Sequence, residues 1–293
     1  MVPMTTPTGP APAPVLLLGG TGRTGRRVAD RLRAHGRTVR TGSRRGDPPF
    51  AWDDPRGWPA LLAGVDAAYV AYAPDLALPE AEGRLRRLGA AAIAAGLERL
   101  VLLSGRGEPA AARSEAALRE ARCPVAVVRS SWFAQDFSEH FLLGPVLEGV
   151  VALPTAGRPD VAEAFVDVDD VADVVTDLLL RPEPSAETFA LTGPELVTFA
   201  EAVAVIAEAT GRPLSYLPLD VDGFVAGAVA AGVPAEEAGP LGQLFAEVLD
   251  GRNEHLTDDV GRVLGRAPRA FGDVVRDAAA TGVWDLPAPA VTA

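Results

Sequence analysis

Three glycines at a spacing of three carry the clearest chemical signal in the sequence. Gly19, Gly22 and Gly25 follow four apolar residues, 15–18, and precede an arginine-rich stretch with helical periodicity. This order predicts a buried strand, a tight turn and the start of a helix. A side chain at the first glycine would obstruct the turn, one at the second would keep a pyrophosphate off the backbone, and one at the third would push the helix off the strand.

The free N–H groups at such a helix start, together with the helix dipole, attract a diphosphate. The turn therefore predicts dinucleotide binding, and the alternative is a glycine-rich loop that binds nothing. The same loop contributes three further candidate cofactor contacts, Thr21, Arg23 and Thr24.

Basic side chains follow the second predicted strand, residues 37–43. In a dinucleotide fold this position faces the adenosine ribose, where an acid selects NAD and an arginine pairs with the 2′-phosphate of NADP. Ser43, Arg44 and Arg45 stand there, and no acid occurs before Asp47. NADPH is therefore the expected cofactor, with Arg44 as the main contact to the phosphate, unless these are solvated loop arginines.

Three more positions are expected to contact the cofactor. Asp53 ends a short expected strand over residues 50–54, where its carboxylate could reach the adenine amino group. Ala73 and Ser104 follow later expected strands, and we place them near the nicotinamide ribose because ligands of such sheets lie at the carboxyl ends of the strands.

The proton relay of ordinary short-chain dehydrogenases is missing. Ser104 occupies the serine position of that relay, but the expected helix over 109–122 has neither tyrosine nor lysine, and all 27 basic residues of the chain are arginine. This argues against ketone or alcohol chemistry by that relay. An iminium carbon, in contrast, accepts hydride without a proton in the same step, so its reduction requires orientation and a dry site more than an acid.

An aromatic segment after the expected strand over residues 125–129 could receive such a substrate. Trp132 and Phe133 could face a cation or a flat heteroaromatic ring, and Asp136 could provide a counter-charge. His140 lies one helical turn further on. The alternatives are core packing for the aromatic residues and a helix N-terminal carboxylate for Asp136. The sequence assigns no catalytic acid or base, and the candidates are Ser104, Asp136 and Tyr72.

Composition argues against several classes of protein. The 293 residues are 48% hydrophobic and 23% charged without a long apolar run, so we expect a soluble globular protein with no membrane span. One cysteine, Cys123, indicates a reducing, cytoplasmic setting, and the 3 histidines lack metal-ligand spacing. Residues 1–14 predict a disordered tail. Monomer and homodimer are both open.

Charge is divided unevenly along the chain. Residues 1–130 carry 19 arginines and 12 acids, whereas residues 131–293 carry 8 arginines and 27 acids. We interpret the positive half as suited to an anionic dinucleotide and the acidic half as suited to a neutral or cationic small molecule. The positive half lacks a continuous basic stripe with interleaved aromatic residues, so no nucleic-acid partner is expected.

Alternating strand and helix patterns predict the fold class. They indicate an α/β, Rossmann-type, doubly wound parallel sheet with right-handed crossovers. We expect this domain over residues 15–156, with a return to the sheet around 164–193. Residues 194–293 are expected to form a smaller, mainly helical substrate lobe.

These segments together resemble the NmrA-like group of atypical short-chain dehydrogenases, and most closely the ergot alkaloid reductases of the festuclavine synthase and agroclavine-forming type. The segments are GGTGRTG, SRRG, FAWDD, LVLLSG, VVRSSWFAQDF, FVDVDDVADVV, LTGPELVTFAEAVAVIAEATGRP and FGDVVRDAAATGVW. The resemblance covers residues 15–284. It implies NAD(P)H binding and reduction of a C=N bond, with the substrate between Trp132 and the C-terminal lobe. Many relatives have Asn where this chain has Asp136.

The combined expectation is an NADPH-dependent reductase of an imine or iminium in a small amine-derived metabolite of secondary metabolism. Because the group that it resembles also contains quinone and azo-dye reductases, an NAD(P)H-dependent quinone or conjugated-acceptor reductase is the first alternative. The second is a redox sensor that binds NADP(H) without turnover.

Overall fold

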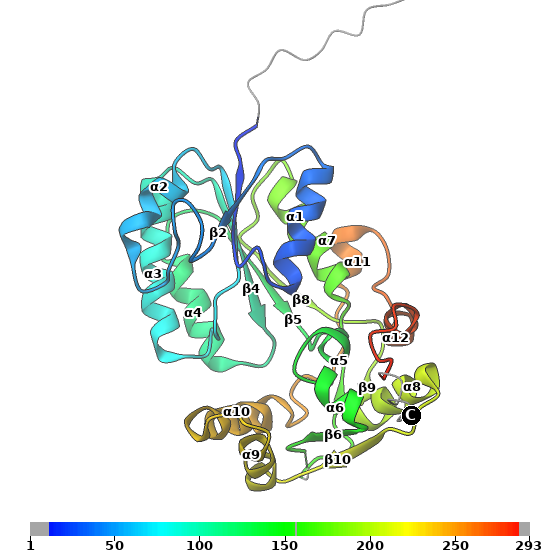
Figure 1. Cartoon of the computed structure of the whole chain (residues 1–293). Helices are drawn as coiled ribbons and strands as arrows, with labels where there is room; N and C mark the ends of the chain where they lie inside the picture. The colour runs from blue at the N-terminus through cyan, green and yellow to red at the C-terminus, as the bar shows by residue number, and fades with distance from the viewer. Residues whose placement is uncertain (1–11, 156, 287–293) are drawn as a thin grey trace, which may run out of the picture.

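Six parallel strands form the main sheet of the computed structural model, which describes residues 12–155 and 157–286 (Figure 1). Their order is β2-β1-β3-β4-β5-β8. The chain therefore places β2 on one side of β1 and the later strands on the other side, so the strand order switches between β1 and β3. Most of the expected tail, residues 1–11, lies outside the described residues. The strands are β1 (Val15–Leu18), β2 (Val39–Gly42), β3 (Ala67–Val70), β4 (Arg99–Gly105), β5 (Val125–Ser130) and β8 (Thr188–Leu191).

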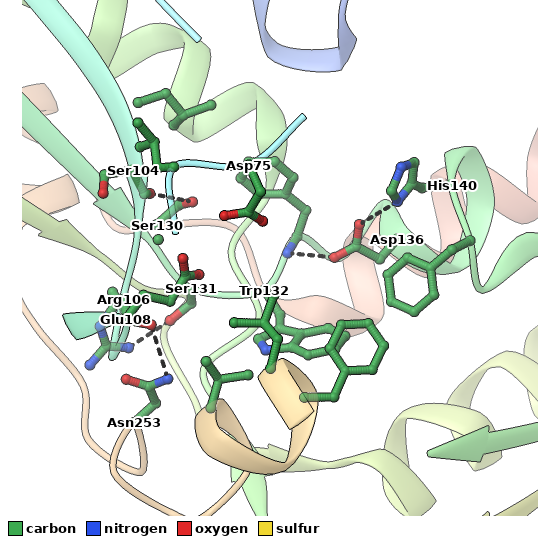
Figure 2. Close-up of a pocket in the computed structure, with 18 of the residues that line it drawn as sticks. Asp75, Ser104, Arg106, Glu108, Ser130, Ser131, Trp132, Asp136, His140 and Asn253 are labelled. Atoms are coloured by element: carbon green, nitrogen blue, oxygen red, sulfur yellow. Dashed lines mark hydrogen bonds and ion pairs between the residues drawn. The ribbon is translucent and has the colours of Figure 1, made fainter. Parts of the chain in front are cut away.

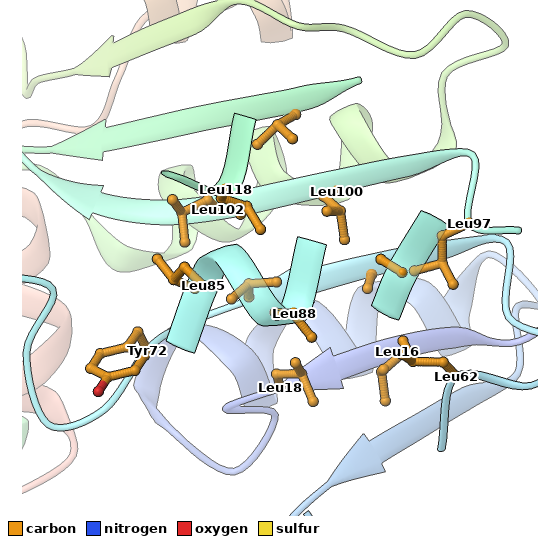
Figure 3. Packing of buried hydrophobic residues seen from close by; sticks show 14 of the residues in the cluster. Leu16, Leu18, Leu62, Tyr72, Leu85, Leu88, Leu97, Leu100, Leu102 and Leu118 are labelled. Carbon is orange, nitrogen blue, oxygen red and sulfur yellow. The ribbon is translucent and has the colours of Figure 1, made fainter. Parts of the chain in front are cut away.

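Helices cover both faces of this sheet, because its strands are apolar on both sides. Alternate residues of β1 point to opposite faces: Leu16 and Leu18 enter one core, and Val15 and Leu17 enter the other. The first core lies beneath α2 (Trp58–Leu62), α3 (Pro79–Ala94) and α4 (Pro109–Arg119), as Figure 3 shows. The second lies beneath α1 (Arg23–Ala34), α7 (Val168–Leu180) and α11 (Asp259–Leu264). The predicted doubly wound fold is confirmed.

A smaller lobe lies beyond the carboxyl ends of the strands (Figure 1). It has a third apolar core, to which Phe165, Phe199 and Trp284 contribute. Two short sheets join it: β6 pairs in parallel with β10, and β7 pairs antiparallel with β9. Its elements are α5 (Asp136–Glu139), α6 (Leu143–Glu148), β6 (Val150–Leu153), β7 (Ala162–Glu163), β9 (Val197–Thr198), α8 (Phe199–Thr210), β10 (Ser215–Pro218), α9 (Val221–Ala230), α10 (Ala235–Val248) and α12 (Phe271–Ala280).

Two predicted strands are wrong. Residues 50–54 form no strand before the 3-10 helix η1 (Pro55–Gly57); instead Phe50 stacks on Trp58, whose indole N–H donates to the carbonyl oxygen of Ala51 at 3.0 Å. This bond and the aromatic packing replace a strand ladder. A strand was also expected over residues 164–168, at the start of the return to the sheet, but these residues join no sheet apart from one bridge between Phe133 and Val166.

None of the helices in residues 12–155 and 157–286 is long and apolar enough to cross a membrane.

The glycine turn holds α1 against β1 through a very close backbone approach. Gly19 has φ +90°, which favours glycine. A Cβ added at Gly25 would lie 2.1 Å from the carbonyl oxygen of Gly19, so only glycine permits this distance between helix and turn. The predicted roles of the first and third glycines are thus seen in the geometry, and the N-terminus of α1 faces the carboxyl ends of the strands.

Arginines on one side of α1 form a ladder of ion pairs with acids from later in the chain. Arg23 pairs with Asp136 of α5, and Arg27 pairs with Glu139 of α5 and Asp169 of α7. Arg26 and Arg31 extend the ladder to Glu139, Asp169 and Asp173. Part of the charge asymmetry along the sequence is therefore used inside the fold, where the basic first half meets the acidic second half.

We expect Gly25→Ala to destabilise the protein by about 1–3 kcal/mol, because the added methyl group must displace α1 from the turn. Gly227→Ala is the matched control: Gly227 lies within α9 with nothing within 4 Å of an added Cβ, so alanine should stabilise the protein by about 0.5–1 kcal/mol. Urea unfolding measures both free energies. Equal effects of the two substitutions would contradict the close approach.

Candidate functional site

Two neighbouring cavities open at the carboxyl ends of the strands, and both are lined by Pro74. The first, of about 1040 Å³, lies over the ends of β1, β2 and β3, and we call it the β2-side cleft. The second, of about 350 Å³, lies over the ends of β4 and β5 and is walled by Trp132, Phe133, Phe141 and Phe245; we call it the aromatic cavity. Both lie where open α/β sheets bind ligands.

The β2-side cleft brings together most of the predicted cofactor residues. Arg44 and Arg45 are exposed there, and neither forms an ion pair with a described residue. Sequence reasoning missed Trp52 and Arg84, which also line this cleft. The predicted residues in its lining are Gly19, Thr21, Ser43, Arg44, Arg45, Asp53 and Ala73.

The other glycine-loop candidates do not line this cleft. Gly22 is the N-cap of α1, and Thr24 and Gly25 are buried in the first turn of the helix. Their backbone matters instead: no side chain caps α1 and no acid lies in its first turn. The N–H groups at this end are therefore available to an anion.

The aromatic cavity is built from both parts of the molecule (Figure 2). Trp132 follows β5, and its ring centroid lies 5.3 Å from that of Phe245 in α10 and 5.8 Å from that of Phe141. Leu244 and Val248 of α10 complete an apolar wall. The cavity therefore offers flat aromatic and aliphatic surface to a small organic molecule.

Asp136 faces this cavity, but an arginine of the protein already neutralises it. Arg23 Nη1 lies 2.5 Å from Asp136 Oδ1, and the Phe133 backbone N–H donates to Oδ2 at 3.1 Å. Burial raises the pKa of Asp136, and Arg23 opposes that rise. A cationic substrate would thus have to compete with Arg23 for this carboxylate. Burial and Arg23 lower the pKa of His140, whose Nδ1 lies 3.8 Å from Asp136 Oδ1.

Ser104 and Tyr72 also line the aromatic cavity, with their hydroxyl groups already engaged. Ser104 Oγ donates to Glu115 Oε1 at 2.6 Å, and Glu115 is paired with Arg129. The Tyr72 hydroxyl accepts a hydrogen bond of 2.7 Å from Arg84 Nη1. The Ser104 hydroxyl therefore helps to position the Glu115 carboxylate. Tyr72 lines the aromatic cavity, and its partner Arg84 lines the β2-side cleft.

Sequence reasoning missed two acids that face the aromatic cavity, Asp75 and Glu108 (Figure 2). Asp75 follows β3, and Glu108 follows β4 as the N-cap of α4. Burial raises the pKa of Glu108 to about 7, with repulsion from Asp75 as the next cause. The strand-end rule that selected Ser104 would have reached both residues had it been extended a few positions into each loop.

A buried polar cluster joins this cavity to the C-terminal lobe. Arg106 is 6% exposed and donates to Ser131 Oγ at 2.6 Å and to the carbonyl oxygen of His255 at 3.1 Å. Burial lowers the pKa of Arg106 and raises that of the adjacent Glu163 to about 8. Within the described parts of the chain, no group of three His, Cys, Asp or Glu side chains could hold a metal ion.

Several known proteins with similar sequences are reductases and dehydrogenases. The chain is 30% identical over 284 residues to (4-alkanoyl-5-oxo-2,5-dihydrofuran-3-yl)methyl phosphate reductase of Streptomyces griseus, covering 88% of this chain and 95% of that protein. It is 28% identical over 280 residues to agroclavine dehydrogenase of Claviceps fusiformis, covering 90% and 96%. No family model matches the chain.

The solved structures that it resembles have the same fold. Triphenylmethane reductase of Citrobacter sp., crystallised with NADP(H), superposes with a TM-score of 0.71 at 17% identity, covering 90% of this chain and 99% of that one. The fold and the relatives define a Rossmann-type oxidoreductase. The chain belongs to the NmrA-like atypical short-chain dehydrogenases and reductases, as its motifs predicted.

We expect Arg23→Ala and Asp136→Ala to be energetically coupled, since the two charged groups lie in contact and only 20% and 8% of their side chains are exposed. The double variant should be more stable than the sum of the two single losses implies, by about 1–3 kcal/mol. Urea unfolding of the four proteins measures this coupling. Strictly additive losses would show that the pair contributes no interaction energy.

Proposed function

We propose that this protein is an NADPH-dependent reductase that transfers hydride to the C=N bond of an imine or iminium in a small amine-derived metabolite of secondary metabolism. The observation that carries this proposal is the junction of the two cavities at Pro74. A dinucleotide extended from the β2-side cleft would bring its reactive end to the aromatic cavity, where the substrate would lie.

The residues of the cleft fit NADPH. The uncapped N-terminus of α1 suits the pyrophosphate, and the close contact between Gly25 and the carbonyl oxygen of Gly19 fixes where that terminus lies. Arg44, with Ser43 and Arg45, would bind the 2′-phosphate. The bound cofactor would supply the hydride. A quinone oxidoreductase of Escherichia coli crystallised with NADPH superposes with a TM-score of 0.73 at 17% identity, covering 90% of this chain and 99% of that one.

The aromatic cavity favours an acceptor with positive charge. Asp75 and Glu108 have no arginine partner among the described residues, whereas Asp136 is balanced by Arg23. Carboxyl groups beside aromatic faces suit a flat cation. We therefore assign the role of counter-charge, first predicted for Asp136, to Asp75. The relatives named agroclavine dehydrogenase support an amine-derived substrate. We also propose that residues after 194 serve as the substrate lobe, since α10 supplies Phe245.

A second candidate is the reduction of a conjugated C=C or quinone acceptor. It is favoured by the Streptomyces relative at 30% identity, because the name of that enzyme describes a dihydrofuran ring flanked by carbonyl groups. The hydride donor and both cavities would be the same. A quinone is neutral and the phosphate ester in the name of that enzyme is anionic, so neither would gain from the acids of the aromatic cavity.

Arg44→Ala should lower kcat/KM for NADPH by about 10- to 100-fold while leaving NADH little changed, because a charge-assisted contact to the 2′-phosphate is worth about 1.5–3 kcal/mol. Arg56→Ala is the control, since Arg56 is exposed nearby but is paired with Asp54. Initial rates with both cofactors measure the effect. Equal losses for NADPH and NADH would contradict the assignment.

Oxidation of NADPH, followed at 340 nm against cyclic imines, N-alkyl iminium salts, quinones, azo dyes and unsaturated lactones, tests the function itself. We expect turnover with the imines and iminium salts. Turnover confined to quinones or lactones would establish the second candidate. Tight NADPH binding without turnover would instead indicate the redox sensor.

A further inference from the structure

Glu108 gives the aromatic cavity a chemical capacity that the sequence did not suggest. Resting on the proposed function, we propose that Glu108 donates a proton to the nitrogen of a neutral imine, so that the substrates include imines which arrive uncharged. This would supply an acid at the site despite the missing Tyr-x-x-x-Lys relay.

The loop between β4 and α4 places the Glu108 carboxyl at the wall of the cavity. The carboxyl lies directly against Gly105, where an added Cβ would be 2.0 Å from Glu108 Oε1. Glycine at this position therefore makes room for the acid. Neither carboxyl oxygen forms a hydrogen bond or ion pair within residues 12–155 and 157–286, so both can meet a ligand.

The charges that face Glu108 come from three elements. Glu115 lies on α4, Glu247 on α10 and Asp75 in the loop after β3. Glu115 is paired with Arg129, and Glu247 lies 3.3 Å from Arg252. Asp75 is thus the neighbouring acid without an arginine partner.

Two arginines lie near this loop, and neither pairs with Glu108. Arg106 belongs to the loop, but its guanidinium donates to Ser131 and to the carbonyl oxygen of His255. Arg252 donates to the carbonyl oxygen of Gly107 at 2.9 Å and pairs with Asp250 and Glu247. Burial and the surrounding acids raise the pKa of Glu108 to about 7, so a large fraction of the carboxyl is protonated at neutral pH.

The other polar groups of the cavity are less suited to this step. The Ser104 hydroxyl donates a hydrogen bond to Glu115, and the Asp136 carboxylate is paired with Arg23. The Tyr72 hydroxyl accepts a hydrogen bond from Arg84, and a phenol is a weaker acid than a carboxyl group. Glu108 therefore combines access to the cavity with a transferable proton.

The step balances without a further reagent. The imine nitrogen lone pair forms the new N–H bond, while the electrons of the broken O–H bond stay on the Glu108 carboxylate. The carbon of the resulting iminium receives the hydride, which leaves a neutral amine and the oxidised cofactor. Glu108 regains its proton from water. Between these events the Glu108 and Asp75 carboxylates would stabilise the cation.

A matched pair of substrates tests this role in the full-length protein: 3,4-dihydroisoquinoline, a neutral imine, and its N-methyl iminium salt, which needs no proton. Glu108→Gln should lose about 100-fold or more of kcat/KM for the imine and less than about 3-fold for the iminium. Glu120→Gln, at the exposed end of α4, is the control and should change neither.

The pH profile is the second readout. Only protonated Glu108 can donate, so kcat/KM for the imine should fall as the pH rises through about 7, whereas that for the iminium should stay level. Asp75→Asn removes a neighbouring negative charge, which lowers the pKa of Glu108 and should move this decline to lower pH. A purely structural role of Glu108 would leave the position of the decline unchanged.

The outcomes separate the two proposals. If the wild-type protein reduces both substrates and Glu108→Gln affects them equally, or affects neither, the proton-donor role is wrong and the imine reductase stands. The role is also wrong if the wild type reduces only the iminium. If the wild type reduces neither substrate, the proposed function fails, and the inference about Glu108 fails with it.

Discussion

Helix α1 lies so close to the turn before it that no Cβ fits between Gly25 and the carbonyl oxygen of Gly19. This one contact fixes where the helix begins and which way its uncapped N–H groups face. It also fixes the position of the arginine ladder, the row of ion pairs that joins α1 to α5 and α7. The first rung, Arg23 with Asp136, holds the segment that carries Trp132, so both cavities depend on the position of α1.

The features that could be predicted from sequence are those with a local cause. The spacing of Gly19 and Gly25 indicates a turn, and Arg44 follows a predicted strand. The positions of these residues could therefore be predicted without knowledge of the fold. Residues 50–54 have a composition typical of a strand. The indole N–H of Trp58 nevertheless donates a hydrogen bond to the carbonyl oxygen of Ala51, and this contact outweighs the local preference for a strand. The raised pKa of Glu108 comes from its burial and from the neighbouring Asp75, which is distant in sequence, so no local pattern indicates it.

The uneven charge of the two halves shows the same limit. As a sequence property it suggested an anionic cofactor and a neutral or cationic substrate. In the structure, Arg27 and Arg31 use acids of the second half as partners between packed helices. What the substrate meets is decided by the few acids that this pairing leaves without an arginine partner at the cavity, Asp75 and Glu108, and burial favours the protonated form of Glu108.

The wall that α10 adds to the aromatic cavity has a consequence for specificity. Leu244, Phe245 and Val248 line the aromatic cavity, whereas the β2-side cleft is built entirely from residues before α4. Helices α9 and α10 pack against each other, and α9 has no buried residue. A substitution in this hairpin that lines the aromatic cavity would therefore leave every residue of the β2-side cleft in place. Under the proposed function, such changes would alter which acceptor fits and keep the cofactor contacts, in keeping with relatives whose names describe chemically unlike substrates.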